Sequence, residues 1–302
     1  MILVALLYIL FASTFTLGKA VLSYISPILF IGIRMIAGGA LLLGYQYFFN
    51  RKKWHFDWAD ISYFFHIALF LIFISFVGEF WALQYISSSK TCLLYNMSPF
   101  ITALFAYYML SEQLSRRQWV GLVIGFLGFI PILINQTTGE MLTKHFWFLS
   151  MPELLLLIAV ISSCYGWMVM RYLVIQRDYS SVMVNGIGMA GGGVMALIAS
   201  LAIEGIPQVA TISLDQVAII AAYTTALILI ANVVCFNLYG VLLRRYSATF
   251  LSFAGVTTPL FAAAFDLIFF KEAITLAFIM TMGIVFVGLW LFYQDEFRAQ
   301  TK

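Results

Sequence analysis

A single carboxylate stands inside the apolar stretch SFVGEFWALQY, residues 75–85, where Glu79 is the only charged residue. An ionised carboxylate facing lipid at this depth costs about 2.5–3.5 kcal/mol, so Glu79 should face the bundle interior, a water-filled cavity or a cation. Arg34 stands at a comparable depth in another apolar run. Two roles for Glu79 follow from this pattern. It either meets a cationic group or a proton inside a cavity, or it forms a fixed buried pair with Arg34 as its charge partner.

Amide, hydroxyl and aromatic side chains occur at similar depth in the other apolar runs. Amides and hydroxyls in lipid prefer interhelical partners or a wet pocket. Aromatic faces can hold a cation or stack on a planar ring. We therefore predict a substrate site built from Phe15, Glu79, Trp81, Tyr95, Asn96, Ser163, Trp167, Asn232 and Tyr239.

No catalytic constellation is visible in the sequence. His55 and His66 are eleven residues apart, His145 lies in a connection, and none forms an H-E-x-x-H pair. The three cysteines, at 92, 164 and 235, lack metal-ligand spacing and fall inside apolar runs, where small buried hydrophobes are expected. We expect no metal, cofactor or catalytic residue. A polytopic membrane enzyme with a lipid-like substrate is the alternative, since a serine and a histidine distant in sequence can meet in a fold.

The composition places these residues in a bilayer. Of 302 residues, 63% are hydrophobic and 10% are charged, which is too apolar for one water-soluble core of this size. A helix crosses the bilayer with about 17–25 apolar residues and satisfies its own backbone groups. We expect an all-α integral membrane protein with ten transmembrane helices, at about 2–22, 27–49, 59–85, 89–110, 117–135, 152–176, 181–203, 213–241, 246–270 and 274–293.

The basic residues predict the orientation. If the N-terminus is cytoplasmic, the inside connections and the C-terminal tail hold ten Lys and Arg residues, whereas the outside connections hold only Lys90, Lys144 and Lys271. Cytoplasmic connections are enriched in these residues. Both termini are therefore predicted to be cytoplasmic, in a multi-pass protein of the inner membrane. The net charge of +3 then reflects topology and does not indicate a nucleic-acid partner.

The chain also repeats itself. A shift of 160 residues lays 99–129 on 259–289 with seven identities, including Pro99 on Pro259 and Glu112 on Glu272. A shift of 154 lays GIRMIAGG (32–39) on GIGMAGGG (186–193) with five identities. We expect two five-helix units, 1–136 and 152–302, joined by an outer connection at 137–151. Because five is odd, the second unit is inverted, which is the geometry of alternating access. Pro99 and Pro259 are candidate hinges or static kinks.

Two stretches carry a family resemblance. A Y-x-S-x-S step at 85–89 and a Y-S-A step at 246–248 lead into apolar runs with a mid-run proline and a closing glutamate. This pattern resembles the paired signature of the drug/metabolite transporter superfamily, in particular its ten-helix EamA-type members. The resemblance implies a secondary transporter that moves a small organic metabolite by alternating access. It also implies proton antiport or facilitated transport. The sequence shows no nucleotide-binding motif, which argues against ATP as the energy source.

The residues of the predicted site indicate the substrate class. A carboxylate beside aromatics and amides favours a small cationic or zwitterionic metabolite, such as an amino acid or a derivative like S-adenosylmethionine. The expected partners are this solute, the lipid bilayer and, as a coupling ion, the proton. Glycines at 38–39 and 191–193 serve close helix packing, either within a monomer or between the protomers of a homodimer.

Overall fold

The computed structural model describes residues 2–51, 56–110, 114–135, 143–146, 149–205, 214–242, 251 and 254–300, nearly all of them helical. Within these ranges, eight helices are long and apolar enough to cross a membrane. The chain is therefore an all-helical integral membrane protein, as predicted. The eight spans are Ile2–Val21, Pro27–Phe49, Trp58–Leu83, Arg116–Ile134, Met151–Ile175, Ser181–Ile203, Leu214–Leu242 and Leu276–Gln294.

Several spans contain more than one helical element. The first half of the chain comprises α1 (Ile2–Val21), α2 (Pro27–Phe49), η2 (Trp58–Asp60), α3 (Ile61–His66), η3 (Ile67–Ile74), α4 (Ser75–Leu83), α5 (Ser88–Tyr95), α6 (Ser98–Leu110), α7 (Arg116–Leu127) and α8 (Ile130–Ile134). The second half comprises the antiparallel pair β1 (His145–Phe146) and β2 (Leu149–Ser150), then α10 (Met151–Ile175), α11 (Ser181–Ile203), α12 (Leu214–Leu227), η5 (Ile228–Cys235), α13 (Phe236–Leu242), η6 (Gly255–Thr257), α15 (Thr258–Phe265), η7 (Asp266–Phe270) and α16 (Leu276–Gln300).

The fourth and ninth expected spans differ from the prediction of one long helix each. In the fourth, a turn at Asn96 and Met97 separates α5 from α6. The Ser98 hydroxyl donates to the Tyr95 carbonyl at 2.5 Å across this turn. Pro99 follows at once, and a proline lacks the N–H that a continuous helix needs. In the ninth, the described apolar helix is the shorter segment Gly255–Phe270.

The backbone is distorted in both halves of the chain, at positions about 160 residues apart. The elements η3 and η5 are both eight-residue π-helices, and their bounds differ by 161 positions. The turn at Asn96 and Met97 likewise corresponds to the 3₁₀ segment η6, which precedes Pro259 as that turn precedes Pro99. π-Helical turns inside α-helices are rare and are frequent at functional sites.

Glycines bring two pairs of helices into close antiparallel contact. On α2, a Cβ at Gly39 would lie 2.7 Å from the Ala190 nitrogen of α11. On α7, a Cβ at Gly121 would lie 2.6 Å from the Gly288 carbonyl of α16. The ends of α2 and α11 are also joined, because Glu204 accepts hydrogen bonds from the amides of Ile28 and Leu29 at 3.0 and 2.9 Å. These contacts make each pair a closely packed unit.

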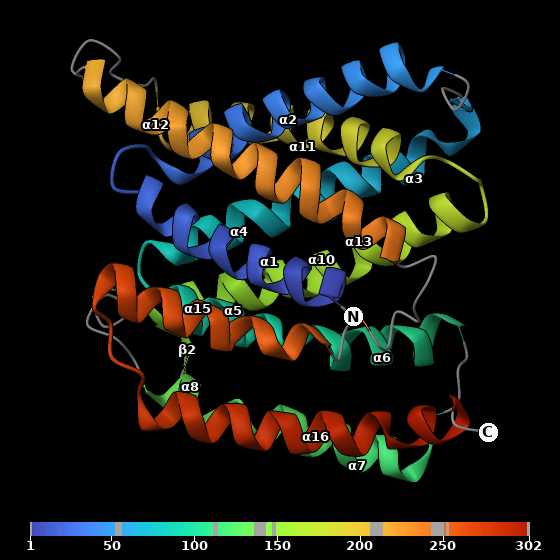
Figure 1. Cartoon of the computed structure of the whole chain (residues 1–302), viewed down its shortest axis with the longest axis vertical. Helices are drawn as coiled ribbons and strands as arrows, with labels where there is room; N and C mark the ends of the chain where they lie inside the picture. Colours follow the sequence, from blue (N-terminus) through green and yellow to red (C-terminus); the bar gives the residue numbers. More distant parts are fainter. Residues whose placement is uncertain are drawn as a thin grey trace.

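The helices lie side by side in a stack (Figure 1). The α2–α11 pair lies toward one end of the long axis and the α7–α16 pair at the other. Between them lie α1, α4, α10, α13, α5 and α15. The start of α1 and the end of α16 are on the same side of the stack, at the right in Figure 1.

Candidate functional site

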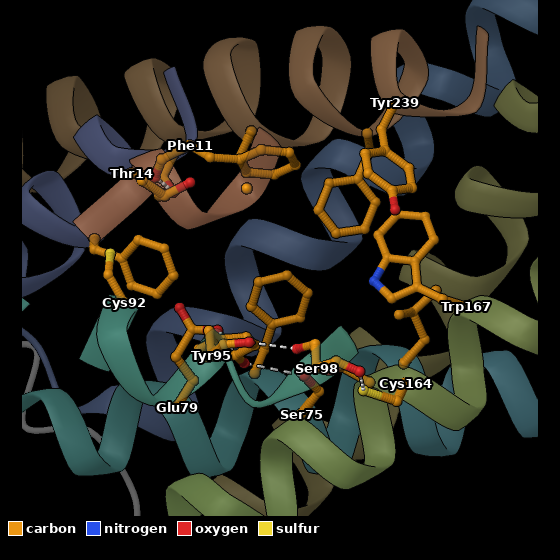
Figure 2. Close-up of a pocket in the computed structure, with 18 of the residues that line it drawn as sticks. Phe11, Thr14, Ser75, Glu79, Cys92, Tyr95, Ser98, Cys164, Trp167 and Tyr239 are labelled. Atoms are coloured by element: carbon orange, nitrogen blue, oxygen red, sulfur yellow. Dashed lines mark hydrogen bonds between the residues drawn. The ribbon is translucent and has the colours of Figure 1, made fainter. Parts of the chain in front are cut away.

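A cavity of about 270 Å³ lies between helices of both halves of the chain (Figure 2). Its wall includes residues of α1, α2, α4, α5 and α6 from the first half and of α10, α13 and α15 from the second. This volume is close to the lower end of the range for small-molecule pockets, about 300–1,000 Å³. Most of the wall is apolar or aromatic, with a few polar groups among these residues.

Glu79 of α4 is a charged group of this wall. Its side chain is buried, and one carboxylate oxygen, Oε2, accepts a hydrogen bond from the Tyr95 hydroxyl at 2.7 Å. The Ser75 hydroxyl lies 3.4 Å from the same tyrosine oxygen. Within the described ranges, the second carboxylate oxygen of Glu79 has no hydrogen-bond partner. Glu79 therefore has acceptor capacity left for a ligand.

Arg34 of α2 lies on the same wall and is 1% exposed. Its Nε donates to Oδ1 of Asn232 at 3.1 Å, and its guanidinium carbon is 5.3 and 5.4 Å from the ring centroids of Phe76 and Phe80. These contacts hold the guanidinium in place by a hydrogen bond and by cation–π attraction. One terminal nitrogen, Nη1, has no hydrogen-bond partner among the residues that the structure describes.

An aromatic group lies across the cavity from Glu79. The ring of Trp167 packs on Phe236 and Tyr239, with centroid distances of 5.2 and 5.0 Å. Figure 2 shows Trp167 and Tyr239 at one end of the cavity and Glu79 and Cys92 at the other. The end of the cavity that carries Glu79 is called the charged end below, and the end that carries Trp167 and Tyr239 the aromatic end.

Polar contacts join α1, α5 and the α15–α16 connection on one side of the stack. Lys19 forms an ion pair with Glu272 at 2.7 Å, and the Ser89 amide donates to Asp266 at 2.7 Å. We call these two contacts the latch. The four residues of the latch line a second cavity of about 420 Å³. The side chains of Ala12, Phe15, Cys92 and Ala262 pack together near the charged end of the central cavity.

The central cavity reaches the surface on the other side of the stack. Near the start of α10, Glu153 forms a buried ion pair with Lys90 at 2.8 Å, which ties this end of the helix to the latch side. Arg171 lies 18 residues further along α10, about 27 Å away at 1.5 Å per residue. Arg171 is exposed and also lines the cavity.

This geometry is found in a chain whose residues 1–134 and 150–294 match the model of the EamA-like transporter family. The chain belongs to that family. Membership confirms the resemblance seen in the sequence and makes the protein a multi-pass membrane transporter rather than an enzyme.

Relatives and a solved structure extend this result. The chain is 32% identical to an S-adenosylmethionine/S-adenosylhomocysteine transporter of Chlamydia muridarum over 290 residues, which cover 96% of this chain and 90% of that protein. It is 30% identical to a transporter of the same name in Chlamydia trachomatis serovar L2, over 96% of this chain and 87% of the relative. One crystal structure aligns over 99% of this chain and 98% of its own with a TM-score of 0.68. Its 15% identity shows a shared fold only.

Seven of the nine binding residues predicted from the sequence line the cavity of this EamA-family chain, and two do not. Trp81 packs on Tyr85 with a centroid distance of 4.8 Å and is absent from the cavity wall. Asn232 is fully buried and bonds to Arg34. The residues on the wall are Phe15, Glu79, Tyr95, Asn96, Ser163, Trp167 and Tyr239.

A direct ion pair with Arg34, one of the two roles considered for Glu79, is not formed among the described residues. No nitrogen of Arg34 lies within 4.0 Å of the Glu79 carboxylate in the described structure, because Asn232 and Tyr95 engage the two groups separately.

Pro99 lines the cavity, whereas the described wall includes Thr258 and not Pro259. Asp266 is buried, with 2% of its surface exposed. Glu112 lies outside the described residues.

Sequence reasoning missed several wall residues, including Ser75, Phe11 and Arg171. Ser75 precedes Glu79 by four residues, a spacing that puts both side chains on one face of a helix. This spacing could have predicted that Ser75 lines the cavity together with Glu79. In the described part of the chain, no group of three His, Cys, Asp or Glu residues could hold a metal ion. All three cysteines are buried, as predicted.

Proposed function

We propose that this chain transports S-adenosylmethionine or S-adenosylhomocysteine across the cytoplasmic membrane by alternating access. The observation that carries the proposal is the central cavity, whose wall combines the charged groups of Glu79 and Arg34 with the aromatic rings of Trp167 and Tyr239. A solute with an amino-acid group and an aromatic base has complementary chemistry. The names of two relatives, 32% and 30% identical over nearly the whole chain, support the same substrates.

The transport cycle uses two inverted five-helix units, residues 1–136 and 152–302. Three observations support this arrangement: the antiparallel α2–α11 and α7–α16 pairs, the π-helices η3 and η5, and the helix breaks before Pro99 and Pro259. Inverted units that rock about a central site expose it to each side of the membrane in turn. The breaks before the two prolines are the candidate hinges.

The structure fits the inward-facing state of this cycle. With both termini cytoplasmic, Arg171 lies on the cytoplasmic side and the latch on the outer side. The central cavity meets the surface near Arg171. The latch and the packed side chains of Ala12, Phe15, Cys92 and Ala262 close the opposite side. In the outward-facing state of this cycle, the latch opens and α10 closes the cytoplasmic side of the cavity.

The test is uptake of labelled S-adenosylmethionine into proteoliposomes that contain the purified protein. We expect saturable uptake, inhibition by unlabelled S-adenosylhomocysteine, and recovery of the labelled solute chemically unchanged. An imposed proton gradient tests proton coupling, because a coupled transporter accumulates solute above equilibrium when the gradient is present. The proposed substrate class is rejected if the protein transports neutral or anionic solutes but shows neither saturable uptake nor exchange of S-adenosylmethionine in either direction.

A further inference from the structure

The geometry points to a single orientation of the ligand in the central cavity: its α-amino acid group lies between Arg34 and Glu79, and its aromatic base lies against Trp167 and Tyr239. Arg34 is then a carboxylate-binding residue and not the internal charge partner of Glu79. This inference rests on the proposed function, because it assigns the two ends of that function's substrate to the two ends of the cavity.

Arg34 is a cation with unused donor capacity. Arginine stays protonated in proteins and carries five N–H donors, of which the structure pairs the Nε donor with Asn232. Arg34 is 1% exposed and lines the cavity. Its buried Nη1 has no hydrogen-bond partner within the described residues. A guanidinium held by Phe76 and Phe80 presents a fixed planar fork, which suits a carboxylate.

Glu79 supplies the opposite charge for the ammonium group. Tyr95 fixes one oxygen of this carboxylate, and the other has no partner in the described chain. The rings that hold Arg34 are those of Phe76 and Phe80, which flank Glu79 on α4. Arg34 and Glu79 therefore line one part of the cavity without pairing. A zwitterionic α-amino acid group inserted there satisfies both charges at once.

The aromatic end suits the remainder of the ligand. Trp167, Phe236 and Tyr239 form one group of packed rings on α10 and α13. Stacking on such rings recognises a planar base, and their faces also attract a sulfonium cation. The buried amide nitrogen of Asn96, which has no partner in the described residues, is a further donor on the wall.

Arg34 and Glu79 both lie in the first half of the chain. The offset of 154 that aligns the second and seventh runs lays Arg34 on Gly188, and the offset of 161 between the two π-helices lays Glu79 on Gly240. The aromatic group belongs to the second half. A ligand bound in the inferred orientation therefore contacts both halves, with its amino-acid end on the first half and its base on the second.

The experiment compares three ligands on the purified full-length protein: S-adenosylmethionine, its decarboxylated form and 5′-methylthioadenosine. Binding is measured by calorimetry for the wild type, Arg34→Gln and the control Trp81→Phe, which changes a residue outside the cavity. We expect the wild type and the control to bind S-adenosylmethionine about tenfold or more tightly than the decarboxylated form, the order expected for a hydrogen-bonded charge. Arg34→Gln should abolish this preference and leave the affinity for the decarboxylated form within about twofold.

Each outcome bears on a distinct claim. If the wild type binds all three ligands equally, or if Arg34→Gln weakens all three by the same factor, the inferred orientation is wrong while the proposed substrate stands. If the wild type binds none of the three, the proposed function itself fails. Should Arg34→Gln not fold, the carboxyl methyl ester of S-adenosylmethionine decides the point on the wild type, because blocking the carboxylate must then cost about tenfold in affinity.

Discussion

The carboxylate of Glu79 is hydrogen-bonded to Tyr95 and not to Arg34, although both charges line the same cavity. Arg34 is held instead by Asn232, which lies in the second half of the chain. In the orientation proposed above, these two separately fixed charges receive the two charges of one ligand. The sequence alone left this role and a fixed internal pair as open alternatives.

Replacement of Glu79 by Gln should reduce S-adenosylmethionine uptake by about tenfold or more, because the amide keeps the shape but loses the charge that attracts an ammonium group. Tyr95→Phe removes the hydroxyl that orients Glu79 at 2.7 Å and should reduce uptake only a few-fold. Initial rates in proteoliposomes with equal amounts of folded protein measure both effects. Full activity of Glu79→Gln would exclude this carboxylate from the site.

Trp167 and Trp81 provide a matched pair, because only Trp167 lines the cavity. Stacking of a base on an aromatic ring contributes about 1–3 kcal/mol. Trp167→Leu should therefore weaken the binding of every adenosine compound by about tenfold, whereas Trp81→Leu should leave these affinities within about twofold. Calorimetric titration with 5′-methylthioadenosine isolates the contribution of the base. Equal losses in the two variants would show that Trp167 does not contact the ligand.

How much of the site is predictable depends on what the sequence encodes locally. The long apolar runs predicted α1, α2, α10 and α11 closely, because about 20 apolar residues and a capping residue define such a span by themselves. Depth along each run also followed from the sequence. The depth of Glu79, Tyr95 and Trp167 along their apolar runs predicted that they lie at the same height in the bundle, and all three line the cavity.

The face of each helix was harder to predict. Trp81 is two residues from Glu79, which is about 200° around an α-helix, so it points away from the cavity that Glu79 lines. Asn232 has the predicted depth, but its side chain is used by Arg34, a contact between residues 198 positions apart. The turn at Asn96 and Met97 was also not foreseen. Pro99 was expected to kink one helix, and the polar residues before it form a break instead.

Close helix packing predicts which glycines tolerate a methyl group. A Cβ at Gly39 or Gly288 would lie 2.6–2.7 Å from backbone atoms of a neighbouring helix, whereas at Gly44 or Gly283 it would meet nothing within 4 Å. Overpacking of this kind costs about 1–3 kcal/mol. Gly39→Ala and Gly288→Ala should therefore lower the Tm in detergent by several degrees, while Gly44→Ala and Gly283→Ala should leave it unchanged or slightly raised. Comparable losses at all four positions would contradict the packing described here.

Two ion pairs on the latch side should respond very differently to neutralisation. The side chains of Lys19 and Glu272 are 21% and 37% exposed, and an exposed pair contributes about 0–1 kcal/mol. Glu272→Gln should thus have little effect on stability but loosen the latch, which raises labelling of an introduced Ser89→Cys by a few-fold in a background without the native cysteines.

Glu153, by contrast, is fully buried against Lys90 and also accepts a hydrogen bond from the Ser150 amide at 2.8 Å. Removing one member of a buried pair leaves an uncompensated charge and costs about 3–5 kcal/mol. Glu153→Gln should therefore lower the Tm far more than Glu272→Gln, measured in parallel in the same detergent. Restoration of stability in the double variant Glu153→Gln with Lys90→Met would identify the unpaired ammonium as the cause. Equal Tm values for the two single variants would mean that the Lys90–Glu153 pair is not buried as the structure has it.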